Sequence, residues 1–273
     1  MITEKRFNTG EAEINYGVSD NDGPPILLLH GTANRWQAFQ PVIPMLMSRW
    51  KVYAPDFRGH GGSQHTEEYG FGFYLEDTLR FIDGVVGEPV VIFGHSLGGR
   101  IATKIAAEHP EKVQTIILGD SSLKEPVPSD RMGKVFSGLI KLIEENKTYQ
   151  RIYKEMQEAD KDFDPVYGLT RAKNLSLLDT RLLKTIAENG MNLDSSGSHF
   201  YGYHPEEHLK KIKCPVLIIQ AEFGMLSTEE VQMALETLPE AYHVVLRDVP
   251  HEFLSKPVEP LLKALNAFLE AIR

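Results

Sequence analysis

The sequence contains a single cysteine, Cys214, among its 273 residues, so no internal disulfide can form. This cysteine opens the apolar run CPVLIIQ, where a free thiol is typically part of the core. No apolar run approaches the roughly 20 residues that a transmembrane helix needs. The first residues, MITEKRFNTG, lack the apolar stretch of a signal peptide. We therefore expect a cytoplasmic protein with no membrane partner.

The chain also has no excess of basic residues. Its 29 Lys and Arg against 38 Asp and Glu give a net charge of -9, which argues against a nucleic-acid partner. Neither a Walker A motif nor G-x-G-x-x-G after a strand is present, so nucleotide binding is unsupported. His204 and His208 lie four residues apart, but H-E-x-x-H spacing is absent. We expect no cofactor and no metal, and the sequence gives no indication of the oligomeric state.

Short runs rich in Val, Ile and Leu recur along the chain, and most are separated by segments of helical period. Continuous apolar runs of this length are typical of strands that are buried on both faces. The runs are Ile26–Leu29, Val52–Ala54, Val90–Phe93, Val113–Leu118, Val216–Ile219 and Val244–Leu246. Strands that alternate with helices predict an α/β fold with a mainly parallel sheet.

Helices are predicted at Gly98–Glu108, at Thr228–Leu238 and at Pro257–Ile272, where apolar residues recur with helical period. The alternation stops between about Ser122 and Lys213. This interval contains no convincing strand and has helical patterns instead, in MGKVFSGLIKLIEEN, YQRIYKEMQ and LLDTRLLKTIAEN. We therefore predict a core formed by residues 1–121 and 214–273, with a helical cap inserted at residues 122–213.

The stretch VVIFGHSLGGRIA places Ser96 between Gly94 and Gly98, at the exit of a predicted strand. This is the pattern G-x-S-x-G of a nucleophile elbow. The serine of such an elbow occupies a sharp, strained turn, which only small residues two positions to either side can accommodate. The turn exposes the hydroxyl above the sheet and at a helix N-terminus, where negative charge is favoured. Ser96 is therefore the candidate nucleophile.

Three further segments make the chain similar to the α/β-hydrolase fold family over nearly its whole length. LLLHGTANRW resembles the family's strand and His-Gly loop, DFRGHGGS the D-x-R-G-x-G-x-S segment, and RDVPHEF the loop of the catalytic histidine. The resemblance implies that Thr32 supplies one backbone N–H of an oxyanion hole, while the N–H of Leu97 supplies the other. It also implies that the cap follows the sixth strand.

The resemblance assigns the base to His251, between the final strand and the final helix. A serine hydroxyl needs such a base because it is barely ionised at neutral pH. His30 and His60 lie inside loop motifs, and we expect them to brace those loops. His95 flanks the nucleophile, and we expect it to help position Ser96. We also expect His95 and Trp36 to form part of the wall of the substrate-binding site.

The acid is where the sequence departs from the family pattern. Most members have an aspartate after the seventh strand, and the corresponding position here is Gly224, in QAEFGML. We favour Asp120, which follows the sixth strand, with Glu222 as the possible alternative acid. A Ser–His dyad assisted by water, or another carboxylate, stays open. Asp248 is too close in sequence to His251 to reach the far ring nitrogen easily.

Cap residues at helical spacing are expected to roof an apolar pocket, although most such residues pack into a core. They are Phe136, Leu139, Ile140, Tyr149, Tyr153, Met156, Phe163 and Tyr167. The function that fits best is a serine hydrolase acting on a small-molecule carboxylic ester or lactone through an acyl-enzyme intermediate. Two alternatives use the same residues, namely C–C bond hydrolysis and cofactor-free perhydrolysis. A ligand-binding relative with little turnover is the alternative from another class. Dehalogenation is disfavoured, since those relatives have an aspartate at the elbow.

Overall fold

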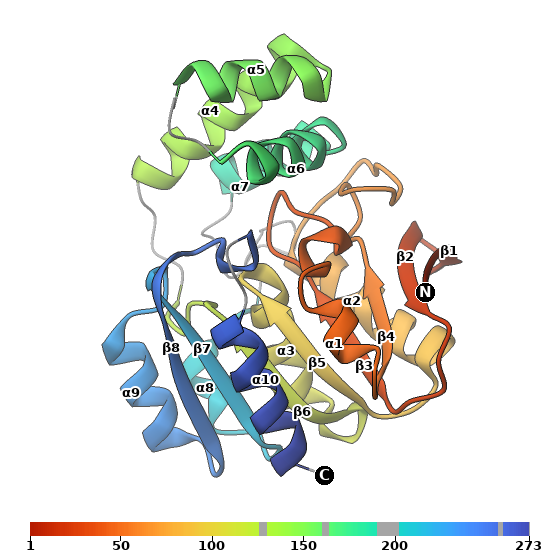
Figure 1. Ribbon diagram of the computed structural model, residues 1–273, viewed down its shortest axis with the longest axis vertical. Coiled ribbons are helices and arrows are strands. Elements are labelled where there is room, and N and C mark those ends of the chain that lie inside the picture. Colours follow the sequence, from red (N-terminus) through yellow and green to blue (C-terminus); the bar gives the residue numbers. More distant parts are fainter. Residues whose placement is uncertain (126–129, 160–163, 190–201, 256–258, 273) are drawn as a thin grey trace.

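A computed structural model describes residues 1–125, 130–159, 164–189, 202–255 and 259–272 of the chain. Eight strands form one sheet in the order β1-β2-β4-β3-β5-β6-β7-β8, with helices on both faces (Figure 1). The strands are β1 Ile2–Asn8, β2 Glu13–Ser19, β3 Pro25–Leu29, β4 Lys51–Pro55, β5 Val90–His95, β6 Val113–Gly119, β7 Val216–Phe223 and β8 Ala241–Pro250. From β4 to β8 the sheet is parallel, and β1 and β2 join it antiparallel. The predicted α/β class is confirmed.

All six predicted strands are present, and β1 and β2 are additional. The search for continuous apolar runs missed β1 because this strand lies at the edge of the sheet and is almost entirely exposed. It missed β2, EINYGVS, because Asn15 and Gly17 interrupt the apolar residues of this otherwise buried strand. An edge strand with water on both faces has no need of such a run.

Strand side chains alternate between two hydrophobic cores, one on each face of the sheet. Leu27 and Ile92 belong to one core, and Leu28 and Phe93 to the other. The first core is covered by α2 Phe71–Phe81, α3 Leu97–Glu108, α8 Pro205–Leu209 and α9 Thr228–Thr237. The second is covered by α1 Ile43–Leu46 and α10 Glu259–Ala271. Each fully buried Leu or Ile side chain contributes roughly 1.5–3 kcal/mol, so these two cores fix the sheet on which the site is built.

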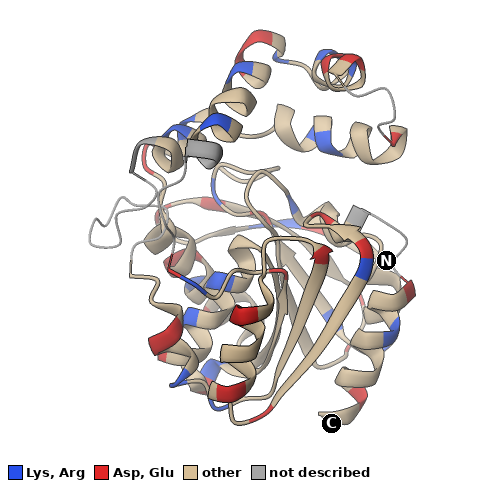
Figure 2. Ribbon diagram, turned by 90° about the vertical axis from the view of Figure 1, so that its left-hand side faces the viewer, with Lys and Arg blue, Asp and Glu red and all other residues tan. Residues whose placement is uncertain are grey.

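Above the carboxyl end of the parallel strands lies a group of four helices, which we call the cap (Figures 1 and 2). They are α4 Asp130–Asn146, α5 Tyr149–Ala159, α6 Pro165–Ser176 and α7 Thr180–Asn189. Three coincide with the expected helical segments, while α6 was not predicted. Its start nevertheless has a clear signal, because Asp164 accepts the N–H of Tyr167 as N-cap and Pro165 occupies the first helical position.

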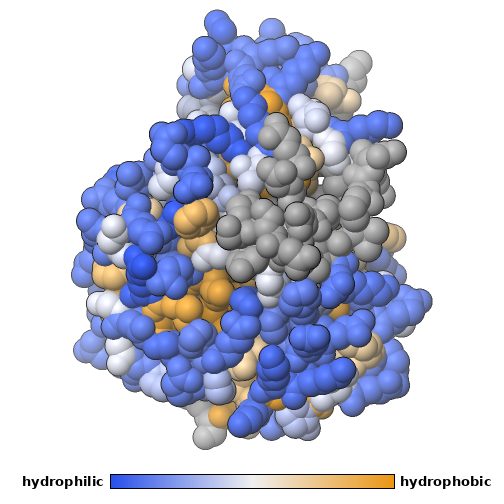
Figure 3. Space-filling view, turned by 180° about the vertical axis from the view of Figure 1, so that it is seen from behind, coloured by the Kyte–Doolittle hydropathy of each residue, from blue (hydrophilic) through white to orange (hydrophobic). Residues whose placement is uncertain are grey.

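Of the remaining sequence expectations, Cys214 is half-buried just before β7, and burial raises the pKa of its thiol to about 11. The final predicted helix is α10, and the first two residues expected in it, 257 and 258, lie outside the described residues. Within the described residues, no helix combines the length and the apolar character required to cross a bilayer. Seen from behind, the surface is mostly hydrophilic, with an apolar area just below the cap (Figure 3).

Candidate active site

Ser96 lies at the sharp turn between β5 and α3, with φ 52° and ψ −113°. A positive φ is unfavourable for a residue with a Cβ, so surrounding contacts must hold the turn in place. The N–H of Ser96 donates to the carbonyl of Gly119 at 3.0 Å, and the hydroxyl of Ser121 donates to the carbonyl of Ser96 at 3.0 Å. Both contacts come from the end of β6, so the neighbouring strand fixes the elbow.

The two glycines of the motif are required by close backbone approach. A Cβ on Gly94 would lie 2.3 Å from the carbonyl carbon of Gly98, and a Cβ on Gly98 would lie 2.0 Å from the carbonyl oxygen of Leu29. Neither neighbour can move without disturbing the sheet or the first turn of α3. The turn therefore has room only for glycine at positions 94 and 98, as the sequence predicts.

Ser96 and His251 line the same cavity, which has a volume of about 590 Å³ and lies between the sheet and the cap. Thr32 and Leu97 also line it. Leu97 is the first residue of α3, so its N–H has no acceptor within the helix. The adjacent N–H groups of the Thr32 loop are engaged elsewhere: that of Ala33 donates to His60 Nε2 at 3.2 Å, and that of Asn34 to the carbonyl of Gly31 at 3.1 Å.

Asp120 lies 2.6 Å from His251, measured from carboxylate Oδ2 to ring Nδ1. The carboxylate is fully buried, and it also accepts the N–H groups of Met225 at 2.7 Å and Leu226 at 3.2 Å. Burial raises the pKa of this carboxyl, but the hydrogen bonds from His251 and from the backbone outweigh burial, so the pKa lies below its ordinary value. Asp120 is thus held as a carboxylate against Nδ1, which leaves Nε2 as the ring nitrogen available for a proton transfer.

Glu222, the alternative acid, is bound elsewhere. Its carboxylate accepts from Arg247 at 2.9 Å and from the backbone N–H of Asp248 at 2.8 Å. These contacts draw its pKa below the ordinary value on an otherwise exposed part of the surface. Glu222 is therefore engaged with Arg247 and Asp248, while His251 is engaged with Asp120.

Gly224 explains the departure from the family pattern in physical terms. A Cβ built on this glycine would lie 2.2 Å from Oδ2 of Asp120 and 2.5 Å from its carboxyl carbon. The space that a side chain at position 224 would enter is already filled by the carboxylate that contacts His251. An acid after β6 and a side chain at this point after β7 consequently exclude each other in this chain.

The structure places His95 and Trp36 differently from the expected substrate wall, since neither is among the described residues that line the cavity. His95 is buried, and its Nε2–H donates to the carbonyl of His251 at 2.9 Å, while burial and the nearby His251 lower its pKa. Trp36 is also buried, with its indole N–H donating to Glu4 at 2.8 Å. Both expectations therefore fail, and His95 instead supports the backbone of the His251 loop.

Sequence reasoning missed two arginines and a glutamate that line the cavity. Arg100 follows the elbow by one helical turn and is buried, and Arg171 reaches down from α6 to donate to the carbonyl of Ala33 at 2.9 Å. Glu252 directly follows His251 and accepts from Asn34 at 2.9 Å. Arg100 could have been found from its spacing to Ser96. Glu252 could have been found from its position next to His251. Arg171 depends on how the cap meets the core, for which the sequence has no signal.

The expected apolar roof is only partly formed by the predicted residues. Phe136 and Leu139 line the cavity, together with Val135 and Ile186. Ile140, Tyr149, Tyr153 and Met156 instead pack against the hydrophobic core, and Phe163 lies outside the described residues. Tyr167 is not among the described residues that line this cavity. The part of the wall that α4 and α7 contribute is therefore apolar, while Arg171 of α6 adds a cation.

Two buried histidines hold the loops around the site in their neutral forms. His30 donates through Nδ1 to the carbonyl of Gly31 at 2.8 Å and accepts the N–H of Phe57 at Nε2, 3.0 Å away. Burial lowers the pKa of His30 to about 4 and that of His60 well below its ordinary value. A proton on Nε2 of His30 would face the N–H of Phe57, so the neutral ring is the form that the fold requires.

This arrangement predicts that the protein loses stability in mild acid. Between pH 6.5 and about 4 the unfolded chain binds a proton at position 30 that the folded protein excludes, so stability falls as the pH falls through this window. The loss from His30 alone should reach about 3 kcal/mol below the folded pKa. Urea unfolding at a series of pH values measures it, and His30→Gln should flatten the slope. The same change at exposed His65 is the control; equal slopes for both variants would refute the assignment.

Comparison with known proteins identifies the family and the fold. The sequence model of the family described as alpha/beta hydrolase fold matches residues 24–256. A serine hydrolase-like protein of Danio rerio is 33% identical over 154 residues, which are 55% of this chain and 44% of that protein. Haloalkane dehalogenase 2 of Mycobacterium tuberculosis is 30% identical over 119 residues, 42% of this chain and 41% of that protein. The chain thus aligns with less than half the length of either relative.

Among solved structures, the N-formylmaleamic acid deformylase of Pseudomonas putida S16 superposes with a TM-score of 0.79. The two chains are 18% identical, and the match covers 96% of this chain and all of the other. At this level of identity the likeness concerns the fold alone.

Proposed function

The chain belongs to the alpha/beta hydrolase fold family, and we propose that it is a hydrolase that cleaves carboxylic esters or lactones through an acyl-enzyme intermediate on Ser96. The observation that carries the proposal is the 2.6 Å contact of Asp120 with Nδ1 of His251, beside a cavity that Ser96 and His251 share. A carboxylate in this position fixes the tautomer in which Nε2 accepts a proton, and it stabilises the imidazolium that forms.

In the proposed mechanism, His251 takes the hydroxyl proton of Ser96 through Nε2 while the oxygen attacks the ester carbonyl. The N–H groups of Leu97 and Thr32 stabilise the tetrahedral oxyanion, and the partial positive charge at the start of α3 adds to that field. His251 then gives the proton to the leaving alcohol. In the second half of the reaction, water takes the place of the alcohol: His251 accepts a proton from the water as it attacks the acyl-enzyme, and then returns that proton to the oxygen of Ser96. The apolar wall of Phe136, Leu139 and Ile186 supports an acyl group of low polarity.

Serine at the elbow also bears on the alternatives. The dehalogenase relative provides no argument for dehalogenation here, since that chemistry uses an aspartate in place of Ser96. C–C bond hydrolysis and perhydrolysis need the same three residues, so the triad does not separate these reactions from ester hydrolysis. The apolar roof is the feature on which we prefer an ester as the substrate. A binding role with little turnover does not account for the contact between the buried Asp120 carboxylate and His251. A cytoplasmic location stays a prediction.

A panel of p-nitrophenyl esters of increasing acyl length, together with simple lactones, tests the proposal. We expect at least one short or medium ester to be hydrolysed with kcat/KM of about 10⁴ M⁻¹s⁻¹ or more, the lower end for natural enzymes. The Ser96→Ala variant supplies the blank. Absence of turnover above that blank on every ester and lactone would contradict the proposed function.

A further inference from the structure

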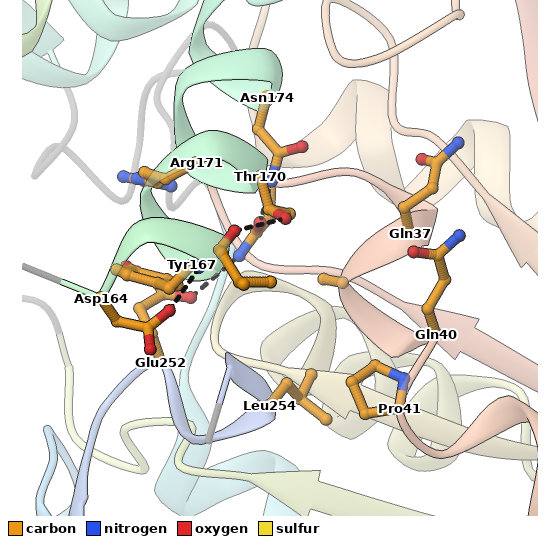
Figure 4. Close-up of a pocket in the computed structure, with 13 residues that line it drawn as sticks. Gln37, Gln40, Pro41, Asp164, Tyr167, Thr170, Arg171, Asn174, Glu252 and Leu254 are labelled. Atoms are coloured by element: carbon orange, nitrogen blue, oxygen red, sulfur yellow. Dashed lines mark hydrogen bonds between the residues drawn. The ribbon is translucent and has the colours of Figure 1, made fainter. Parts of the chain in front are cut away.

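Helix α6 of the cap contacts the loop that contains Thr32. Asn174 and Arg171 are the residues of α6 that make this contact (Figure 4). Asn174 donates through Nδ2 to Oδ1 of Asn34 at 2.7 Å, and Arg171 donates to the carbonyl of Ala33 at 2.9 Å. The first two residues after Thr32 are therefore bonded to the cap, from which they are 140 and 138 residues apart in sequence.

The contact between the two asparagines is part of a hydrogen-bond chain that ends in a charge on each side. Arg35 can only donate, and its Nε donates to Oδ1 of Asn174 at 2.6 Å. At the other end, Glu252 accepts from Nδ2 of Asn34 at 2.9 Å. Burial raises the pKa of Glu252, but nearby basic side chains and this hydrogen bond outweigh burial, so its pKa is below the ordinary value. The two charged ends therefore fix the orientation of both amides.

Asn34 in turn helps to orient the N–H of Thr32. The backbone N–H of Asn34 donates to the carbonyl of Gly31 at 3.1 Å, and the same carbonyl accepts from Nδ1 of His30 at 2.8 Å. The peptide between Gly31 and Thr32 is trans, so its N–H points away from its carbonyl. Because the carbonyl is turned toward the fully buried His30, the N–H of Thr32 is turned the other way, and both residues of this peptide line the catalytic cavity.

The loop needs such contacts because its backbone is strained. Ala33 has φ 59°, which is unfavourable for a residue with a Cβ and persists only where the surroundings hold it. Its N–H donates to Nε2 of His60 at 3.2 Å, and its carbonyl accepts from Arg171. Asn34 and Asn174 are both buried, at 6% and 3% exposure, so water does not replace their mutual hydrogen bond. The shape of the loop therefore depends on α6 as well as on the core.

We propose that Asn174 is a positioning residue for the oxyanion hole. Through Asn34 it holds the peptide between Gly31 and Thr32 with its N–H directed toward the oxyanion. The inference rests on the proposed function, in which the N–H of Thr32 stabilises the tetrahedral intermediate. The cap then contributes to transition-state stabilisation as well as covering the cavity, because displacing a catalytic group by about 1 Å can lower a rate about a hundredfold.

Alanine variants of the two asparagines test this assignment on the best ester of the panel. We expect Asn174→Ala and Asn34→Ala each to lower kcat about 10- to 100-fold with KM within about twofold of the wild type, since an oxyanion hole acts on the transition state. The double variant should lie within about twofold of the slower single variant, because both changes break the same chain. Asn146→Ala is the matched control in α4, where the side chain donates to the carbonyl of Leu142, and its kcat should be unchanged.

Two ketones of equal chain length separate this role from a general loosening of the cavity. With a trifluoromethyl ketone, the oxygen of Ser96 bonds to the carbonyl carbon, the hydroxyl proton passes to His251, and the carbonyl oxygen becomes an oxyanion. The methyl ketone binds without this addition. In Asn174→Ala the Ki of the trifluoromethyl ketone should rise in proportion to the loss of kcat/KM, while that of the methyl ketone stays within about twofold.

Asn174→Asp serves as the second variant should the alanine variants not fold. It keeps the volume of the side chain and the contact with Arg35, but its carboxylate cannot donate to Asn34. We expect the same pattern as for Asn174→Ala, namely a lower kcat, a similar KM and a weaker trifluoromethyl ketone.

The outcomes separate the inference from the proposed function. If the wild type cleaves no ester and is not inhibited by the trifluoromethyl ketone, both fail. If it cleaves esters while Asn174→Ala or Asn174→Asp keeps the wild-type kcat, the function stands and the positioning role is wrong. A higher KM with unchanged kcat, or an equal rise in Ki for both ketones, would overturn the role too, because α6 would then only shape the cavity. Additive losses in the double variant would show that Asn174 does not act through Asn34.

Discussion

Replacing Asp120 with Asn is expected to lower kcat on esters by on the order of 10⁴-fold, with a much smaller effect on KM. The amide keeps the size of the carboxylate but has no negative charge. Its NH2 group can also donate to Nδ1, which favours the wrong tautomer of His251. It therefore loses both the tautomer control and the stabilisation of the imidazolium. Steady-state kinetics on the best ester of the panel measures the effect.

Glu222→Gln is the matched control, since it makes the same chemical change in the other candidate acid. We expect its kcat to stay within about twofold of the wild type, because Glu222 is bound to Arg247 and to the backbone of Asp248. A near-normal rate for Asp120→Asn together with a large loss for Glu222→Gln would reverse the assignment of the acid.

The close approach of Gly224 to Asp120 makes the same assignment testable by gain of activity. Asp120→Ala vacates the space that a side chain at position 224 would need, so adding Gly224→Asp introduces a carboxylate into that space from the end of β7. We expect the double variant to recover at least about tenfold in kcat over Asp120→Ala. Gly224→Asp alone should lose activity, because its Cβ would lie 2.2 Å from Oδ2 of Asp120.

The second large effect is expected from Ser96→Ala, which should lower kcat by on the order of 10⁵- to 10⁶-fold. The variant removes the attacking oxygen but leaves the cavity, the N–H groups of the oxyanion site and the Asp120–His251 pair in place. Its KM should change little, and a residual rate above the uncatalysed reaction is expected from those groups. Alanine at position 96 still has to adopt φ 52°, so the strain of the turn is retained.

Thermal unfolding is the control for Ser96→Ala. The variant should melt within a few degrees of the wild type, because no core contact is lost. Retention of more than about one per cent of the wild-type rate would show that another nucleophile carries the reaction.

Much of the fold and part of the site could be predicted from the sequence. Continuous runs of Val, Ile and Leu predict the buried strands. The two glycines predict the elbow, because the close backbone contacts of this turn exclude a Cβ at either position. The edge strand β1 could not be found in this way, because nothing buries it.

The acid could not be decided from the sequence, and the reason is physical. Asp120 directly follows β6, and Glu222 lies near the end of the neighbouring strand β7. The difference between them lies in their partners, which come from distant parts of the chain. His95 and Trp36 failed as wall residues because adjacency to a site in sequence does not fix the direction of a side chain. Both point into the protein, where His95 supports the loop of His251.

Covalent labelling by a fluorophosphonate, followed by peptide mass spectrometry, tests most directly whether Ser96 is an activated nucleophile. We predict a single adduct on the peptide that contains Ser96 in the wild type, none in Ser96→Ala, and labelling slowed by orders of magnitude in Asp120→Asn. An unlabelled wild-type protein, or an adduct on any other serine that persists in Ser96→Ala, would contradict the account.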